Sequence, residues 1–166
     1  MGLHEKSHIV HLVDFGLSKK YRDNKNHQHI PYKENRSLTG TVRYSSINTH
    51  LDLEYSRRDD LESVGYMLEY FYKGSLPWQG LHANTNAEKY SKILQCKQSI
   101  PIEVQFMDMP VEFCTYMHYV RTLKFADRPD YSFIRKLFTD LMDKLGYEKD
   151  YVYDWCLLKH SVKLEN

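Results

Sequence analysis

Two short motifs near the start of the chain contain residue types that bind metal ions. Residues 4–8 read His-Glu-Lys-Ser-His, the spacing that in zinc proteases places two histidines one helical turn apart. That motif needs a buried helix, whereas this stretch is polar and runs into a strand-like segment, so we reject zinc. Asp14 is followed by Phe15 and Gly16 after an apolar run, and such a sequence taken alone more often forms a turn.

Around Asp14 the sequence predicts a short strand followed by a long irregular stretch. Residues 7–17 alternate and then become apolar, which predicts a short strand that ends at a turn near Gly16. Residues 18–53 show no sustained period of 2 or 3.6, so they predict a long irregular stretch. Irregular segments of this length are uncommon inside compact domains and are usually functional or disordered. We therefore expect this stretch to carry part of the function.

Helices are expected only in the second part of the chain. Asp59 or Asp60 can cap the first helix, which ends at Gly74 and has apolar residues around most of its circumference. The pattern predicts three further helices: one over residues 87–96, one from Pro110, and one from about Asp130 to Gly146. A helix that is apolar on many sides is expected to be buried from several directions.

Composition excludes several classes of protein. The 166 residues, 42% of them hydrophobic, suit one globular domain. The net charge of +1 gives no general field for nucleic acid or anionic lipid, so neither partner is expected. Three widely spaced cysteines without a CxxC pair indicate neither a disulfide framework nor a zinc knuckle. No apolar run approaches the roughly 18 residues of a membrane span, so we expect a cytoplasmic or nuclear protein without a membrane anchor.

Three longer motifs resemble one known family. They read LTGTVRYSSINTH at residues 38–50, SRRDDLESVGY at residues 56–66 and GSLPWQGL at residues 74–81. Their order and spacing resemble the casein kinase 1 family of serine/threonine protein kinases, in which an SIN triplet stands where most kinases have APE. Ser46, Ile47 and Asn48 resemble that triplet. The likeness continues at residues 20–23, 27–35, 128–138 and 150–155, so it covers nearly the whole chain.

This resemblance implies a mainly α fold. The chain is similar to the large, carboxy-terminal lobe of a protein kinase alone, with a long irregular activation segment and about four main helices. Residues 1–160 would form this incomplete kinase domain, and residues 161–166 a short tail. The long irregular stretch then corresponds to the activation segment, which explains why it lacks a regular period.

The resemblance also implies roles for three residues. Asp14 would bind the Mg²⁺ that sits on the ATP phosphates, since it matches the Asp of the kinase DFG motif. Thr41 would occupy the substrate-docking turn; the alternative is a plain turn threonine. Asp60 would accept hydrogen bonds from the backbone of the catalytic loop, a role that is compatible with capping a helix.

Arg43 and Lys89 match basic positions that in this family bind a phosphate or acidic group of the protein substrate. Arg offers a planar fork of donors to an oxyanion, and Lys adds a point charge. The family has further basic residues before the lysine, whereas this chain reads Asn-Thr-Asn-Ala-Glu at residues 84–88. Glu88 is therefore expected to weaken anion binding, and Lys89 has the alternative of being a solvated residue on a helix.

Several kinase motifs are not found in this sequence. It contains no GxGxxG, no ATP-binding lysine motif and no Arg-Asp pair before Asp14 where the catalytic loop would lie. By resemblance the chain begins just before the DFG motif, inside a kinase domain. We expect it to be inactive alone and to associate through its exposed central helix. The alternative function is that of a truncated, non-catalytic fragment that binds substrates or partners.

Overall fold

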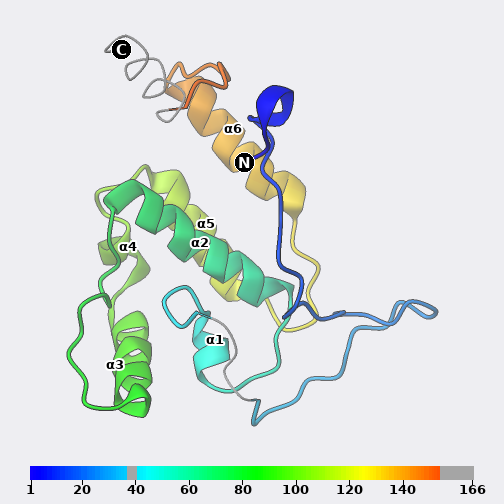
Figure 1. Ribbon diagram of the computed structural model, residues 1–166, viewed down its shortest axis with the longest axis vertical. Helices are drawn as coiled ribbons and strands as arrows, with labels where there is room; N and C mark the ends of the chain where they lie inside the picture. Colours follow the sequence, from blue (N-terminus) through cyan, green and yellow to red (C-terminus); the bar gives the residue numbers. More distant parts are fainter. Residues whose placement is uncertain (37–40, 154–166) are drawn as a thin grey trace. The chain divides into compact units, whose positions relative to one another are not determined.

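The computed structural model describes residues 1–36 and 41–153, and its regular structure is helical (Figure 1). The chain divides into a large unit, residues 17–138, and a terminal unit, residues 1–16 with residues 139–166. The elements are a 3₁₀ turn at His4–Lys6 and the helices α1 Ile47–His50, α2 Arg57–Lys73, α3 Asn86–Ser99, α4 Ile102–Gln105, α5 Val111–Thr122 and α6 Tyr131–Lys144. The described residues form no β-strand, only an isolated bridge between Arg22 and His29. The expectation of a mainly α fold is confirmed.

Helix α2 ends where the sequence predicts but begins earlier. Gly74 ends it with φ of 76°, a left-handed conformation that glycine adopts without strain. The residue before the helix is Ser56, whose backbone N–H donates to the Asp59 carboxylate at 2.9 Å. The prediction that Asp59 or Asp60 caps the helix is therefore confirmed for Asp59, which lies in the first turn and reaches back to cap it.

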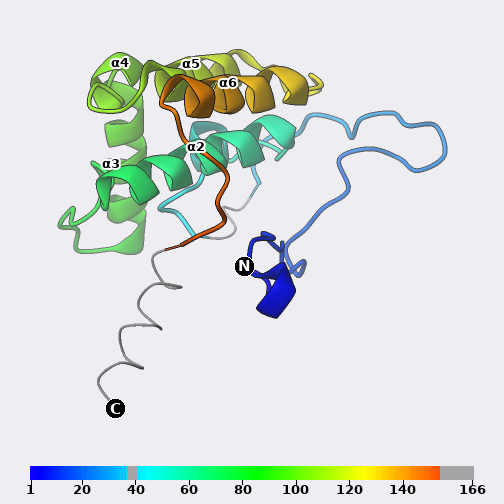
Figure 2. The same cartoon turned by 90° about the horizontal axis from the view of Figure 1, so that it is seen from above.

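Helices α2 and α5 pack side by side in the large unit, as Figures 1 and 2 show. Their close approach depends on Gly65, because a Cβ atom there would collide with Met117 Sδ and crowd the Tyr116 ring. Tyr66 is fully buried, and its ring meets the Trp78 ring edge-on with centroids 4.9 Å apart. Tyr66 thus belongs to the core, whereas Val64, Phe71 and Tyr72 of the same helix are exposed, so the burial of α2 from several directions that its apolar circumference predicts is not found.

Three further predicted helices are confirmed, with capping residues that explain their starts. Thr85 accepts the Glu88 N–H through Oγ1 at 3.1 Å before α3. Pro110 precedes α5, and the Asp130 carboxylate accepts the Phe133 N–H at 2.9 Å at the start of α6. Nothing helical in the described part of the chain combines the length and apolar character needed to cross a bilayer.

The predicted strand at residues 7–17 is wrong. The segment is irregular, and short-range hydrogen bonds hold its start, such as the one from the Gly2 N–H to the Ile9 carbonyl at 2.8 Å. Leu12 and Val13 are 82% and 79% exposed. A strand needs a neighbouring strand for its backbone donors and acceptors, and none of the described segments forms a β-ladder with residues 7–17. Apolar alternation was therefore insufficient to predict the element.

Candidate functional site

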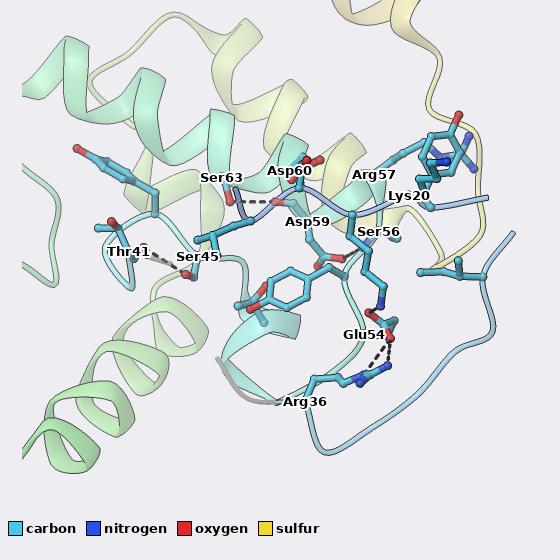
Figure 3. A pocket seen from close by; sticks show the side chains of 18 residues that line it. Lys20, Arg36, Thr41, Ser45, Glu54, Ser56, Arg57, Asp59, Asp60 and Ser63 are labelled. Atoms are coloured by element: carbon cyan, nitrogen blue, oxygen red, sulfur yellow. Dashed lines mark hydrogen bonds and ion pairs between the residues drawn. The ribbon is translucent and has the colours of Figure 1, made fainter. Parts of the chain in front are cut away.

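A pocket of about 770 Å³ lies beside the start of α2 in the large unit (Figure 3). It is lined by residues 17–21, by the loop before α1, and by the first turns of α2. Thr41 and Asp60, which the sequence predicts as site residues, both line it. The fold therefore brings these two candidates to the same space.

The triplet Ser46–Asn48 fixes the wall of this pocket by binding α2. Ser46 Oγ donates to Asp59 Oδ1 at 2.7 Å, and Asn48 Nδ2 donates to the same oxygen at 3.2 Å. The Ile47 N–H donates to Glu62 Oε1 at 3.1 Å. Asp59 is only 3% exposed, so its charge is satisfied by these donors rather than by water. Each residue of the triplet thus anchors the irregular segment to α2.

A buried carboxylate, Glu54, neutralises two basic residues that line the same pocket. Lys19 Nζ lies 2.6 Å from its Oε1, and an Arg36 guanidinium nitrogen lies 2.8 Å from its Oε2. Burial alone would raise the pKa of Glu54, but the hydrogen bonds and charges of Lys19 and Arg36 outweigh it and lower the pKa. Glu54 therefore remains ionised and ties two distant parts of the irregular segment together.

Asp60 and Thr41 contribute different groups to this pocket. Asp60 is an exposed residue, yet the protein around its carboxyl group removes part of its hydration. This partial burial, followed by the charge of Asp59, raises the pKa of Asp60. The Thr41 carbonyl accepts the Ser45 hydroxyl and the Tyr44 N–H, both at 3.2 Å, which fixes its turn. The pocket thus offers a positioned hydroxyl-bearing turn and a carboxylate acceptor to a polar segment.

A second pocket, of about 410 Å³, brings Arg43 and Lys89 together. Arg43 comes from the loop before α1, and Lys89 comes from the first turns of α3. Thr41 lines this pocket as well as the first one. Two basic side chains and the positive end of a helix therefore surround one cavity that adjoins the Thr41 turn.

Arg43 is held from both its backbone and its side chain. The Trp78 indole N–H donates to the Arg43 carbonyl at 2.8 Å. The guanidinium carbon lies 5.7 Å from the Tyr70 ring centroid and 5.8 Å from the Tyr44 ring centroid. Contacts of this kind favour a cation over an aromatic face and limit the positions that the guanidinium can adopt.

Glu88 is not among the residues that line the second pocket, although it precedes Lys89 in sequence. Its carboxylate lies 2.7 Å from Lys92 Nζ and accepts the Asn84 N–H at 2.7 Å. The hydrogen bond from Lys92 and then the one from Asn84 lower the pKa of Glu88. Because Lys92 compensates its charge, Glu88 reduces the positive potential of the pocket less than sequence proximity suggests.

Asp14 belongs to the terminal unit and is described there by itself. It has φ of 64°, and its Oδ1 accepts the Gly16 N–H at 3.3 Å, so the predicted turn is present. Among the residues that the structure describes, no three His, Cys, Asp or Glu side chains form a group able to hold a metal ion. Asp14 therefore offers one carboxylate, and a Mg²⁺ held by it would take its other oxygens from phosphates and water.

Sequence reasoning missed the most deeply buried charges of the site, Asp59, Glu54 and Lys97. A signal for Asp59 existed, because Ser46 and Asn48 are polar residues two positions apart, and both donate to Asp59 Oδ1. Glu54 and Lys97 gave no signal, since their partners are distant in sequence. The motif residues 38–40 and 154–155, and the tail at 161–166, lie outside the described residues.

The structure thus pairs Thr41 with Asp60 and Arg43 with Lys89, and it describes Asp14 separately. The sequence was also compared with models of known protein families. No family model matches the chain.

Proposed function

We propose that this chain is the substrate-receiving part of a casein kinase 1-like serine/threonine protein kinase, acting in the cytoplasm or nucleus. The whole enzyme would transfer the ATP γ-phosphate to Ser or Thr of acidic or already phosphorylated proteins. The proposal rests on the order of sequence motifs and on the geometry of the two pockets. Its fold would be the large lobe of a kinase.

The observation that carries the proposal is that Arg43 and Lys89 line one pocket together with Thr41. Thr41 also lines the pocket that contains Asp60. A peptide whose anionic group occupies the second pocket would therefore extend toward the first, where a hydroxyl could be presented. Arg and Lys with a helix N-terminus provide the donors that a phosphate or carboxylate requires.

ATP with Mg²⁺ would supply the phosphoryl group and the charge stabilisation in the whole enzyme. Among the residues that the structure describes, the carboxylate of Asp14 would be a ligand of that group, and no cluster of three His, Cys, Asp or Glu accompanies it. Phosphoryl transfer depends on positioning by several groups, so we assign no transfer step to this chain alone. The chain's own contribution is to bind the substrate anion and to orient the Thr41 turn.

An alternative proposal is a non-catalytic protein that binds substrates through the same pockets or partners through α2. It is favoured by the apolar side chains that α2 leaves exposed, since Val64, Phe71 and Tyr72 are 37%, 69% and 55% exposed. A buried Leu- or Phe-sized side chain contributes roughly 1.5 to 3 kcal/mol. Covering this side of α2, by association or by another segment, would therefore be strongly favourable.

The decisive experiment is a fluorescence anisotropy titration with a labelled phosphoserine peptide rich in acidic residues. We expect Arg43→Gln and Lys89→Gln each to lower the affinity by roughly 10-fold, because each removes a charge-assisted donor. Lys124→Gln removes the same charge from an exposed position outside both pockets and is the matched control. Equal binding by all four proteins would contradict the anion site.

A second measurement separates the two functions. We expect the chain to show no thermal shift with Mg²⁺ and ATP and to transfer no phosphate to the peptide. Phosphoryl transfer that Asp14→Ala abolishes would exclude the non-catalytic function. Peptide binding without transfer would fit both proposals, and adding a polypeptide that carries a glycine-rich loop, lysine and catalytic loop would then decide: restored transfer favours the kinase.

A further inference from the structure

Lys97 of α3 is a fully buried lysine, with 0% of its surface exposed. Its Nζ donates to the Ser45 carbonyl at 2.5 Å and to the Val42 carbonyl at 3.2 Å. His50 Nε2 lies 3.2 Å from the same nitrogen. An ammonium group has three N–H donors and no acceptor, so these three partners use all of its donors.

The neighbours of Lys97 favour its charged form as the donor. Burial first, and then the Lys97 charge, lower the pKa of His50 to about 4, so the imidazole is neutral and its Nε2 can accept. The Tyr66 and Trp78 ring centroids each lie 4.8 Å from Lys97 Nζ, which adds attraction for a cation. The ammonium thus sits between two carbonyls, a neutral imidazole and two aromatic rings.

The two carbonyls that Lys97 binds flank Arg43 on both sides. Val42 precedes it and Ser45 follows it by two positions, while the Arg43 carbonyl itself accepts the Trp78 indole N–H. This loop belongs to no helix or strand, so turn hydrogen bonds within it and side chains from other elements determine where its backbone lies. Lys97 and Trp78 bind the backbone on both sides of Arg43 and at Arg43 itself.

We propose that Lys97 is the positioning residue of the anion pocket, and that loss of its proton releases the Arg43 loop and weakens anion binding. This inference rests on the proposed function, since it concerns the regulation of the same pocket. Lys97 does not line the pocket, so its role differs from those of the Arg43 and Lys89 side chains. Lys97 affects anion binding only through the position of the loop.

Burial places the titration of Lys97 near neutral pH, and the surrounding charges modify it. Burial lowers the pKa of Lys97 to about 7; the Arg121 charge also lowers it, while Glu62 and Cys96 raise it. The titratable or charged groups that face it come from four elements: His50 of α1, Glu62 and Tyr66 of α2, Cys96 of α3 and Arg121 of α5. A neutral amine keeps two N–H donors and gains an acceptor lone pair, so deprotonation ends the donation to all three partners at once and removes the charge that strengthens the bonds to the Val42 and Ser45 carbonyls.

The two consequences of deprotonation have opposite signs. Anion affinity falls as pH rises through about 7, because the hydrogen bonds that hold the loop lose their charge assistance. The free energy of unfolding rises with pH between about 7 and the ordinary lysine value of 10.5, because the unfolded chain binds more protons in this range. A residue that only stabilised the fold would not weaken binding while stability increased.

The test uses sulfate as the probe, because sulfate keeps the same charge throughout the range. Two-dimensional NMR of the full chain follows sulfate binding and the signals of Val42, Ser45 and the Trp78 indole from about pH 6 to about pH 9. We expect sulfate affinity to fall about 5- to 10-fold over this range, with the loop signals moving in the same titration. Lys97→Met should bind weakly at every pH, and Lys124→Met should behave as the unmutated chain.

Each outcome decides a separate point. Unchanged affinity across the range in the unmutated chain, or normal affinity in Lys97→Met, would overturn the inference. Should Lys97→Met fail to fold, the pH profile of the unmutated chain alone decides. A third result is possible: the loop signals titrate with pH, but neither the unmutated chain nor Arg43→Gln binds sulfate. This result would support the positioning by Lys97 and overturn the anion site of the proposed function.

Discussion

The two ends of α2 bury carboxylates in different ways. Near its start, Asp59 accepts hydrogen bonds from Ser46, Asn48 and the Ser56 backbone at 2.7 to 3.2 Å. Near its end, Glu69 is 0% exposed, and its Oε2 accepts the Gln105 side-chain amide at 2.6 Å. Within the part of the chain that the structure describes, Glu69 Oε1 and Gln105 Oε1 have no hydrogen-bond partner.

This difference shows which of the two buried carboxylates has a uniquely determined position. A buried carboxylate with several donors fixes a unique arrangement, whereas an orphaned buried oxygen lowers the free energy of unfolding. Burial raises the pKa of Glu69, and the Gln105 hydrogen bond and the Lys73 charge only partly offset it. The Asp59 carboxylate beside the pockets therefore has several donors, whereas the opposite end carries a polar pair that apolar residues could replace.

The largest effect is expected for Asp59→Ala. This change removes the acceptor of the buried Ser46 hydroxyl, the buried Ser56 N–H and the half-buried Asn48 amide, so the free energy of unfolding should fall by about 3 to 5 kcal/mol. Urea denaturation followed by far-UV circular dichroism measures it. A loss below about 1 kcal/mol, the net value of one ordinary hydrogen bond, would show that the start of α2 is not pinned by Asp59.

A gain is expected at the other end. The double variant Glu69→Met, Gln105→Met replaces the polar pair with side chains of similar length, and unfolding should require about 1 to 2 kcal/mol more. Because the folded pKa of Glu69 is raised above 4.5, its contribution to stability falls as pH rises through that raised pKa. The double variant should lack this slope in urea titrations at several pH values, and a loss of stability would reverse the comparison.

Glu54→Gln should lower the free energy of unfolding by about 1 kcal/mol, since its partners Lys19 and Arg36 are half-exposed. The folded pKa of Glu54 is lowered below 4.5, so its stabilisation is complete above that value and is lost as pH falls through the folded pKa. Acid titration of thermal stability should therefore differ between the two proteins mainly at low pH. Parallel acid profiles would show that the Glu54 ion pairs contribute nothing.

The smallest effect is expected for Asp60→Ala, the neighbour of Asp59. Asp60 is exposed, and both partial burial and the Asp59 charge disfavour its ionised form, so stability should change by less than about 0.5 kcal/mol. Thermal denaturation of Asp59→Ala and Asp60→Ala side by side measures the contrast. Similar losses in both variants would mean that the two acids share one structural role.

Local signals predicted the helices well. Gly74 and Gly146 both have positive φ after helices, and Thr85 and Asp130 cap helices, because these roles depend on the residue and its immediate neighbours. The strand at residues 7–17 was predicted wrongly, because a strand depends on a partner that periodicity does not reveal.

The candidate site was predictable only in part, for the same reason. Arg43 and Lys89 were found through a motif pattern, and the fold brings them together. Asp59 was expected as a possible helix cap but not as the buried acceptor of Ser46 and Asn48, because two adjacent acids look alike in sequence until burial distinguishes them. Lys97 was missed because its partners at Val42 and Ser45 are backbone carbonyls, which every residue has.

The enclosure of Lys97 also makes it a built-in reporter of local opening. Acylating reagents need access to a free amine, and the carbonyls, imidazole and aromatic rings around Lys97 deny it in the closed loop. Its modification must then wait for the loop to open, so the labelling rate, read by peptide mass mapping against exposed lysines, measures how often the loop opens. The Lys97 amine of α3 thus reports the opening rate of the neighbouring loop.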